Sequence, residues 1–75
     1  MYSITFGRLN GESVSFDKIT EIRTADYISK LKPISEKEIL NYAFNTKYVY
    51  QLIGENFNII FYRETDYISV SKTSD

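Results

Sequence analysis

The stretch KYVYQLIGENFNIIFYRETDYISV, residues 47–70, decides the fold, because it is the most apolar part of the chain and contains four of its seven tyrosines. Its β-branched and aromatic residues favour strand over helix. Polar turn residues divide the stretch into three short apolar runs. It therefore predicts a three-stranded antiparallel meander over 47–53, 57–63 and 66–71.

The turns of this meander determine which side chains share a face. A three-residue loop over 54–56 pairs Ile53 with Phe57, and a two-residue loop then pairs Phe61 with Ile68. The predicted core face contains Val49, Ile53, Phe57, Ile59, Phe61, Ile68 and Val70. The opposite face contains Tyr48, Tyr50, Leu52, Asn58, Ile60, Tyr62, Tyr67 and Ser69. This second face is rich in tyrosine and also carries two large aliphatic residues.

The segment ISEKEILNYAF, residues 34–44, carries the signals of a helix start. Ser35 can cap the first free N–H groups, and Glu38 three residues later completes a capping box. The apolar residues at helical spacing are Ile39, Leu40, Ala43 and Phe44. We therefore predict a helix over 36–44 whose apolar stripe packs on the core face of the meander. One alternative stays open: a single long helix over 36–53 that ends at a glycine and precedes a hairpin.

The opening YSITFGRLNGESVSF, residues 2–16, predicts a β-hairpin, because apolar and small polar residues alternate on both sides of Asn10 and Gly11. A two-residue loop would set apolar side chains opposite polar ones. A three-residue loop pairs Phe6 with Val14 and gathers the apolar side chains on one face. We predict this longer loop, with Gly11 in the left-handed conformation.

Residues 17–32 show neither a clean helical period nor a clean strand period. We predict an extended segment over 18–23, then a short helix over 25–31 with Thr24 as its N-cap. Pro33 ends this helix, because the residue before a proline is pushed out of the helical region.

A chain of 75 residues with 43% hydrophobic and 16% aromatic residues can build one small core. The predicted fold is a single α+β domain over residues 1–75: an N-terminal hairpin, one or two short helices, and a C-terminal meander packed on the 36–44 helix. There is no cysteine, no secretory signal and no apolar run of membrane-spanning length. We therefore expect a cytoplasmic protein without membrane contact. The abundance of Ile, Lys and Asn over Ala suggests AT-rich coding DNA, as in a low-GC bacterium or its phage.

The composition excludes several kinds of chemistry. Without His or Cys there is no histidine base, no cysteine nucleophile and no zinc site of the usual kinds. The three glycines are isolated, so no phosphate-binding loop is present. We expect no enzyme activity, no catalytic residue, no cofactor and no metal site.

The tyrosine-rich face is the candidate binding surface. Exposed apolar patches usually mark interaction sites, and Tyr is common there because it buries a large area at small entropic cost. The predicted partner-binding residues are Tyr48, Tyr50, Ile60, Tyr62, Arg63 and Tyr67. We expect a non-enzymatic protein-binding module that regulates or inhibits a larger protein. Its size and composition would suit a phage or mobile-element protein directed at a host factor such as a defence nuclease.

Three alternatives stay open. Residues 1–32 could cover the tyrosine-rich face and give a two-sided core. The face could instead stack the bases of single-stranded nucleic acid, although a net charge of −1 counts against phosphate binding. It could also pair with its own copy in a symmetric homodimer.

Overall fold

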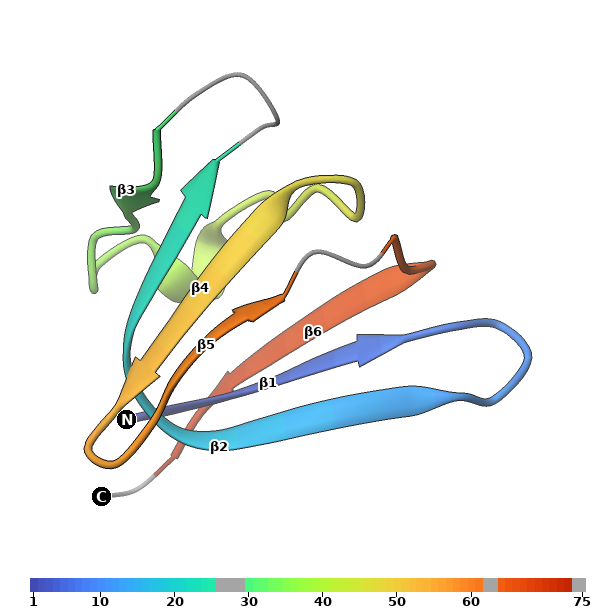
Figure 1. Cartoon of the computed structure of the whole chain (residues 1–75), viewed down its shortest axis with the longest axis horizontal. Coiled ribbons are helices and arrows are strands. Elements are labelled where there is room, and N and C mark those ends of the chain that lie inside the picture. The colour runs from blue at the N-terminus through green and yellow to red at the C-terminus, as the bar shows by residue number, and fades with distance from the viewer. Residues whose placement is uncertain (26–29, 62–63, 74–75) are drawn as a thin grey trace.

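The structure is a bent antiparallel β-sheet (Figure 1). The computed structural model describes residues 1–25, 30–61 and 64–73. Its strands in chain order are β1 (Tyr2–Gly7), β2 (Ser13–Ala25), β3 (Lys32–Pro33), β4 (Val49–Gly54), β5 (Asn58–Phe61) and β6 (Tyr67–Lys72). A short 3-10 turn, η1 (Ile39–Asn41), lies between β3 and β4. The strand order is β5-β4-β2-β1-β6, and β3 pairs with β2 off this path.

Strand β2 serves two parts of the sheet and bends between them (Figure 1). Lys18 at the bend has a φ of +56°, in the left-handed region. β1 pairs with β2 up to Ile19, and β4 pairs with β2 from Ile19 to Ala25. Both ladders shift register close to the bend. Because of the bend, the two parts of the sheet fold round one core.

The hairpin of β1 and β2 confirms the predicted register. Phe6 lies opposite Val14, and the Arg8 N–H donates to the Glu12 carbonyl across the loop at 2.8 Å. Gly11 has a φ of +96°, and its N–H donates to the Arg8 carbonyl at 3.1 Å. This arrangement is a turn followed by a left-handed residue, the three-residue loop that an Asn-Gly pair favours.

The predicted helix over 36–44 is wrong. η1 is one short turn, and at Tyr42 the chain is already extended, with φ −70° and ψ 137°. Leu40 of the predicted stripe is exposed. Tyr42 and Phe44 pack edge to face, with 5.0 Å between ring centroids, and Phe44 also packs on Tyr50. A helix this short is weak alone, and extended chain lets two aromatic residues at spacing two meet the core.

The other helical predictions do not stand either. The alternative helix over 36–53 is wrong, because Val49 to Gly54 form β4. Of the predicted helix over 25–31, residues 26–29 lie outside the described part of the chain, and Ala25 belongs to β2. The fold is therefore mainly antiparallel β-sheet, and the predicted α+β class is incorrect.

The predicted meander is wrong at its last strand. β6 pairs with β1 instead of β5, with Tyr67 opposite Gly7. The Asp66 N–H donates to the Gly7 carbonyl at 2.8 Å. The Tyr67 ring lies over Gly7, where a Cβ atom would collide with it. The pair joins residues sixty positions apart in sequence, so no local pattern indicates it.

β4 and β5 do form a hairpin, but its register differs by one residue from the prediction. Leu52 lies opposite Ile59, and the Gly54 N–H donates to the Phe57 carbonyl at 2.9 Å, which closes a two-residue loop. Side chains alternate along a strand, so a slip of one residue turns the strand over. Tyr50 and Leu52 therefore face the core.

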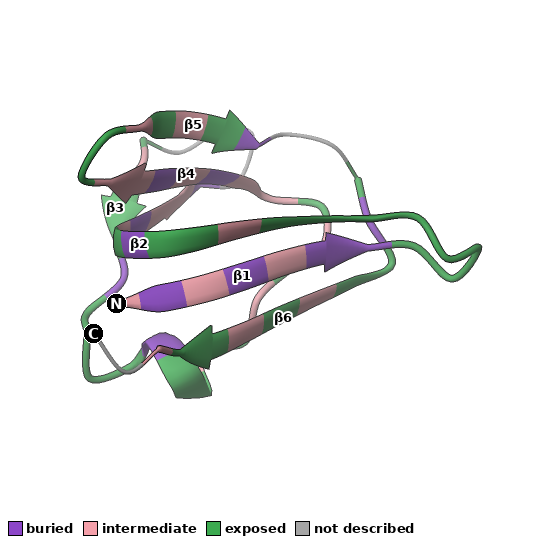
Figure 2. Ribbon diagram, turned by 90° about the horizontal axis from the view of Figure 1, so that it is seen from below, coloured by how far each residue is buried: buried purple, intermediate pink, exposed green. Residues whose placement is uncertain are grey.

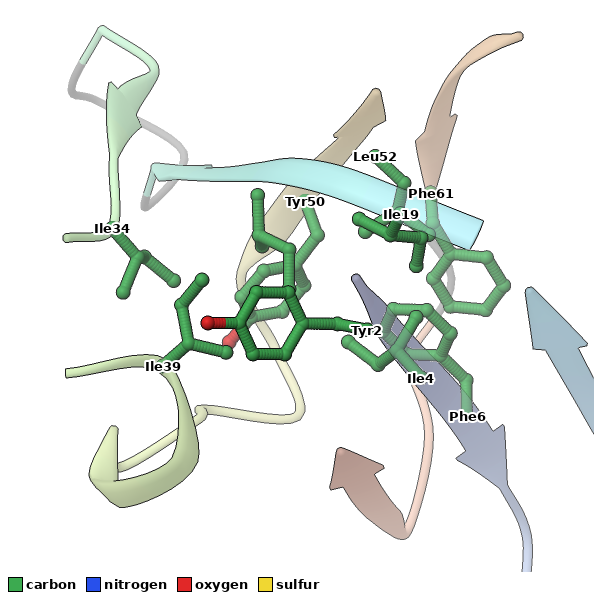
Figure 3. Close-up of a cluster of buried hydrophobic side chains, with 10 residues drawn as sticks. Tyr2, Ile4, Phe6, Ile19, Ile34, Ile39, Tyr50, Leu52 and Phe61 are labelled. Atoms are coloured by element: carbon green, nitrogen blue, oxygen red, sulfur yellow. The ribbon is translucent and has the colours of Figure 1, made fainter. Parts of the chain in front are cut away.

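The core lies inside the bend, and its buried residues range from Tyr2 in β1 to Phe61 in β5 (Figures 2 and 3). Its buried residues are Tyr2, Ile4, Phe6, Ile19, Ile22, Ile34, Ile39, Tyr50, Leu52 and Phe61. The Tyr50 hydroxyl accepts the Asn45 N–H and donates to the Asn45 carbonyl, both at 2.8 Å. Burial raises the pKa of this hydroxyl. In the described ranges, no helix has the length and apolarity needed to cross a membrane.

Candidate functional site

A pocket of about 620 Å³ lies along the outer half of the β1–β2 hairpin. One wall comes from the hairpin itself, which projects beyond the rest of the sheet in Figure 1. The other wall comes from the end of β5 and from residues 64–65. We call this pocket the hairpin groove. Its volume lies within the range of known ligand and anchor-residue pockets.

The floor of the hairpin groove is aromatic. The rings of Phe6 on β1 and Phe61 on β5 stack with 3.9 Å between centroids and 14° between planes. Phe16 packs edge-on against both rings, at 6.2 and 6.3 Å. Val14 also lines the groove and is 39% exposed. Phe6 and Phe61 are largely buried by these contacts, so Val14 supplies the more exposed apolar part of the groove.

The rim of the hairpin groove carries charge. Arg8, Glu12 and Glu64 line the groove, and all three are exposed. The Arg8 Nε lies 3.9 Å from Asp66 Oδ2. The same carboxylate oxygen accepts the Leu9 N–H at 2.8 Å. Asp66 therefore offsets the guanidinium charge of Arg8 and connects the hairpin loop to the start of β6. The other two rim carboxylates, Glu12 and Glu64, have no cationic partner among the described residues.

A polar group is buried beside the groove. Thr65 lines it, and its Oγ1 has no hydrogen-bond partner among the described residues. Its N–H donates to the Thr46 carbonyl at 3.3 Å. A buried hydroxyl without a partner costs free energy. The wall of the groove therefore contains a buried hydroxyl that no described residue satisfies.

The structure places the predicted partner-binding residues on different parts of the molecule. Tyr50 is 1% exposed and belongs to the core, and Tyr48 just before β4 is half-buried. Ile60 on β5 is 52% exposed, and Tyr67 on β6 is 42% exposed. Strands β5 and β6 are the two ends of the sheet order, so these two residues do not share a ladder. The remaining two predicted residues, at 62 and 63, lie outside the described part of the chain.

The sequence predicts other roles for the apolar residues of the groove. Phe61 counted as core, and Phe6 and Val14 as the apolar face of a hairpin. No local signal joins these residues, because the groove forms only where the hairpin meets the end of β5 and residues 64–65. Leu9 is 87% exposed, so the hairpin ends in an open apolar surface.

The described residues limit the kinds of ligand that the site can bind. Across residues 1–25, 30–61 and 64–73, no three His, Cys, Asp or Glu side chains lie close enough to hold a metal ion. The groove offers an apolar floor, carboxylates and one guanidinium, which suits recognition by shape and charge.

Comparison with known proteins gives no relative to guide the assignment. No protein-family model, curated protein or solved structure matches the chain.

Proposed function

We propose that this protein is a non-enzymatic protein-binding module that regulates a larger protein. The observation that carries the proposal is the hairpin groove, where stacked aromatic rings form the floor of a pocket of about 620 Å³. Two exposed apolar residues lie on the same hairpin: Val14 lines the groove, and Leu9 is at the hairpin tip. An apolar pocket with a polar rim is the usual form of a protein-binding hot spot.

The charges of the groove support a protein partner over a nucleic acid. Phosphate backbones are bound by clusters of Lys and Arg. Here Arg8 faces Asp66, while Glu12 and Glu64 add negative charge to the rim. The net charge of the whole chain is −1. A partner surface with an apolar anchor and a basic residue complements this groove.

The absence of cysteine supports placing this activity in a reducing cytoplasm. The small size and AT-rich coding bias support a source in a phage or a mobile element, with a host protein as the target.

A pull-down with matched variants tests the function. The immobilised protein is exposed to a bacterial lysate at moderate salt, with and without nuclease, beside Val14→Asp and Leu40→Asp. Both variants put a carboxylate on exposed apolar surface, but Leu40 lies on η1, away from the groove. A protein retained after nuclease treatment, lost with Val14→Asp and kept with Leu40→Asp would support the proposal.

Two results would contradict it. Retention that disappears with nuclease would show that nucleic acid is the ligand. Equal retention by Val14→Asp would show that the groove is not the binding surface.

A further inference from the structure

The outer half of β2, residues 13–18, has one edge that pairs with no described strand. β1 pairs with residues 13–16 on one side, whereas β4 begins its pairing with β2 only at Ile19. No described strand pairs with residues 13–18 on the side away from β1. The hairpin groove lies at this part of the hairpin, because Ser13 and Val14 line it.

The hydrogen bonding of the hairpin shows which backbone groups point to the unpaired edge. In an antiparallel ladder, hydrogen-bonded and non-hydrogen-bonded pairs alternate. Arg8 donates to Glu12, so the next pair, Gly7 with Ser13, is a non-hydrogen-bonded pair. In agreement, the Gly7 carbonyl accepts a bond from the β6 side instead. By the same alternation, the N–H and C=O groups of Ser13 and Ser15 point away from β1.

We propose that the hairpin groove binds an extended segment of a partner protein, which adds to β2 as a further antiparallel or parallel strand at Ser13 and Ser15. This inference rests on the proposed function and specifies its mode. Main-chain hydrogen bonds to a free edge are the basis of strand addition. The partner segment is a strand with apolar residues at alternate positions, one of which enters the groove above Phe6 and Phe61.

Charge complementarity determines the flanking residues of that segment. The rim carboxylates, Glu12 and Glu64, have no ion pair among the described residues, and Arg8 already faces Asp66. A Lys or Arg beside the apolar anchor would pair with them. A second copy of the chain is disfavoured as the occupant, because its groove would bring the same carboxylates against these.

Hydrogen exchange tests the premise in the free protein. The amide protons of Ser13 and Ser15 should exchange at least tenfold faster than those of Val14 and Phe16, which point to β1. Similar protection at all four amides would overturn the inference, because the edge would then already be paired.

Peptide selection tests the binding itself. A library of random nine-residue peptides is selected on the wild-type protein, and the enriched peptides are measured on Ser15→Pro and Ser15→Ala. Proline on an edge strand removes the outward N–H and blocks pairing. Alanine keeps that N–H, and both variants lose the hydroxyl contact with Thr5. Circular dichroism confirms that each variant is folded.

The expected result is enrichment of peptides with alternating apolar residues and a Lys or Arg. They should bind Ser15→Ala normally and Ser15→Pro at least tenfold more weakly. Peptides N-methylated at every second amide test the same bonds without altering the protein. Methylation of the amides that face β2 should cause a similar loss of affinity. Methylation of the amides in between should cause little loss.

Three results would overturn the inference: no enrichment, equal binding to Ser15→Pro and Ser15→Ala, or no effect of N-methylation at either set of peptide amides. Light scattering that shows a dimer sensitive to Ser15→Pro would assign the edge to a second copy instead. A lysate partner that is lost with Val14→Asp but kept with Ser15→Pro would leave the proposed function standing and reject strand addition alone.

Discussion

The inner and outer halves of β2 differ in how many strands they pair with and in how deeply they are buried. The inner half, from Ile19 to Ala25, has β4 on one side and β3 on the other, and Ile19 and Ile22 are fully buried. The outer half, from Ser13 to Lys18, pairs with β1 alone among the described strands and is mostly exposed (Figure 2). One continuous strand thus supplies both a packed scaffold and an open edge. On the proposed function, stability and binding therefore depend on separate parts of the same strand.

The largest expected effect comes from truncating one apolar residue in each half, buried in the inner half and exposed in the outer. Ile22→Ala should lower the free energy of unfolding by about 3–4 kcal/mol, because it leaves a cavity in the core. Val14→Ala should lower it by less than about 1 kcal/mol, because the Val14 side chain is partly exposed and has room around it. Urea denaturation of both variants measures the difference. Equal losses would mean that the outer half is part of the core.

The bend between the halves gives the next effect, because Gly54 packs against it. A Cβ at Gly54 would lie 2.8 Å from the Lys18 carbonyl oxygen and would also meet the Phe57 ring. The carbonyl belongs to the backbone and cannot rotate away, so Gly54→Ala should cost about 2 kcal/mol. Gly7→Ala is the matched control. The three atoms nearest to its Cβ all belong to the Tyr67 side chain, which can turn outward, so Gly7→Ala should cost about 1 kcal/mol.

Thermal unfolding of the two glycine variants separates these cases. A larger loss for Gly7→Ala than for Gly54→Ala would show that the Tyr67 ring is fixed, and that the β1–β6 junction is more rigid than the bend.

The two hairpins show how much of the fold the sequence could predict. Around Asn10 and Gly11 the turn chemistry and the alternation agree, so the register was predictable. Around Gly54 both loop lengths leave apolar residues opposite each other, and the prediction chose the wrong one. Tertiary packing, such as the close approach of Gly54 to the Lys18 carbonyl, joins distant parts of the chain and is not visible in the local sequence. The pairing of β6 with β1 is equally invisible to a local pattern.

The candidate site was less predictable than the fold. Tyrosine content alone does not distinguish surface from core, and Tyr50 lies in the core because the Asn45 backbone satisfies its hydroxyl. The hairpin groove depends on the meeting of β1, β2 and the end of β5, which follows from the bend in β2.

Tyr50→Phe tests the packed core beside the inner half of β2 and has a smaller expected effect. It removes the two hydrogen bonds to Asn45 and should lower the free energy of unfolding by about 1–2 kcal/mol. Burial raises the pKa of the Tyr50 hydroxyl above the ordinary tyrosine value of about 10. The neutral form is favoured by folding, so this contribution is fully present below about pH 10 and is lost as the pH rises through the folded pKa.

Unfolding free energies measured from pH 8 to 11 check this dependence. The wild type should lose stability above pH 10 more steeply than Tyr50→Phe, since the variant has no hydroxyl to ionise there. Parallel curves would mean that other tyrosines cause the alkaline loss.

The smallest expected effect concerns Lys18 itself, where the two halves of β2 join. A non-glycine residue in the left-handed region costs about 1–2 kcal/mol, and Lys18 has a φ of +56°. Glycine would remove this cost but would lose about 0.5–1 kcal/mol more chain entropy on folding. Lys18→Gly should therefore stabilise the protein by about 0.5 kcal/mol, and Lys18→Ala should change it little. If Lys18→Gly destabilises instead, contacts of the lysine side chain hold the bend. If it stabilises, the bend is imposed by the strand pairing that precedes and follows Lys18 in the sequence. The open edge then follows from the topology of the sheet.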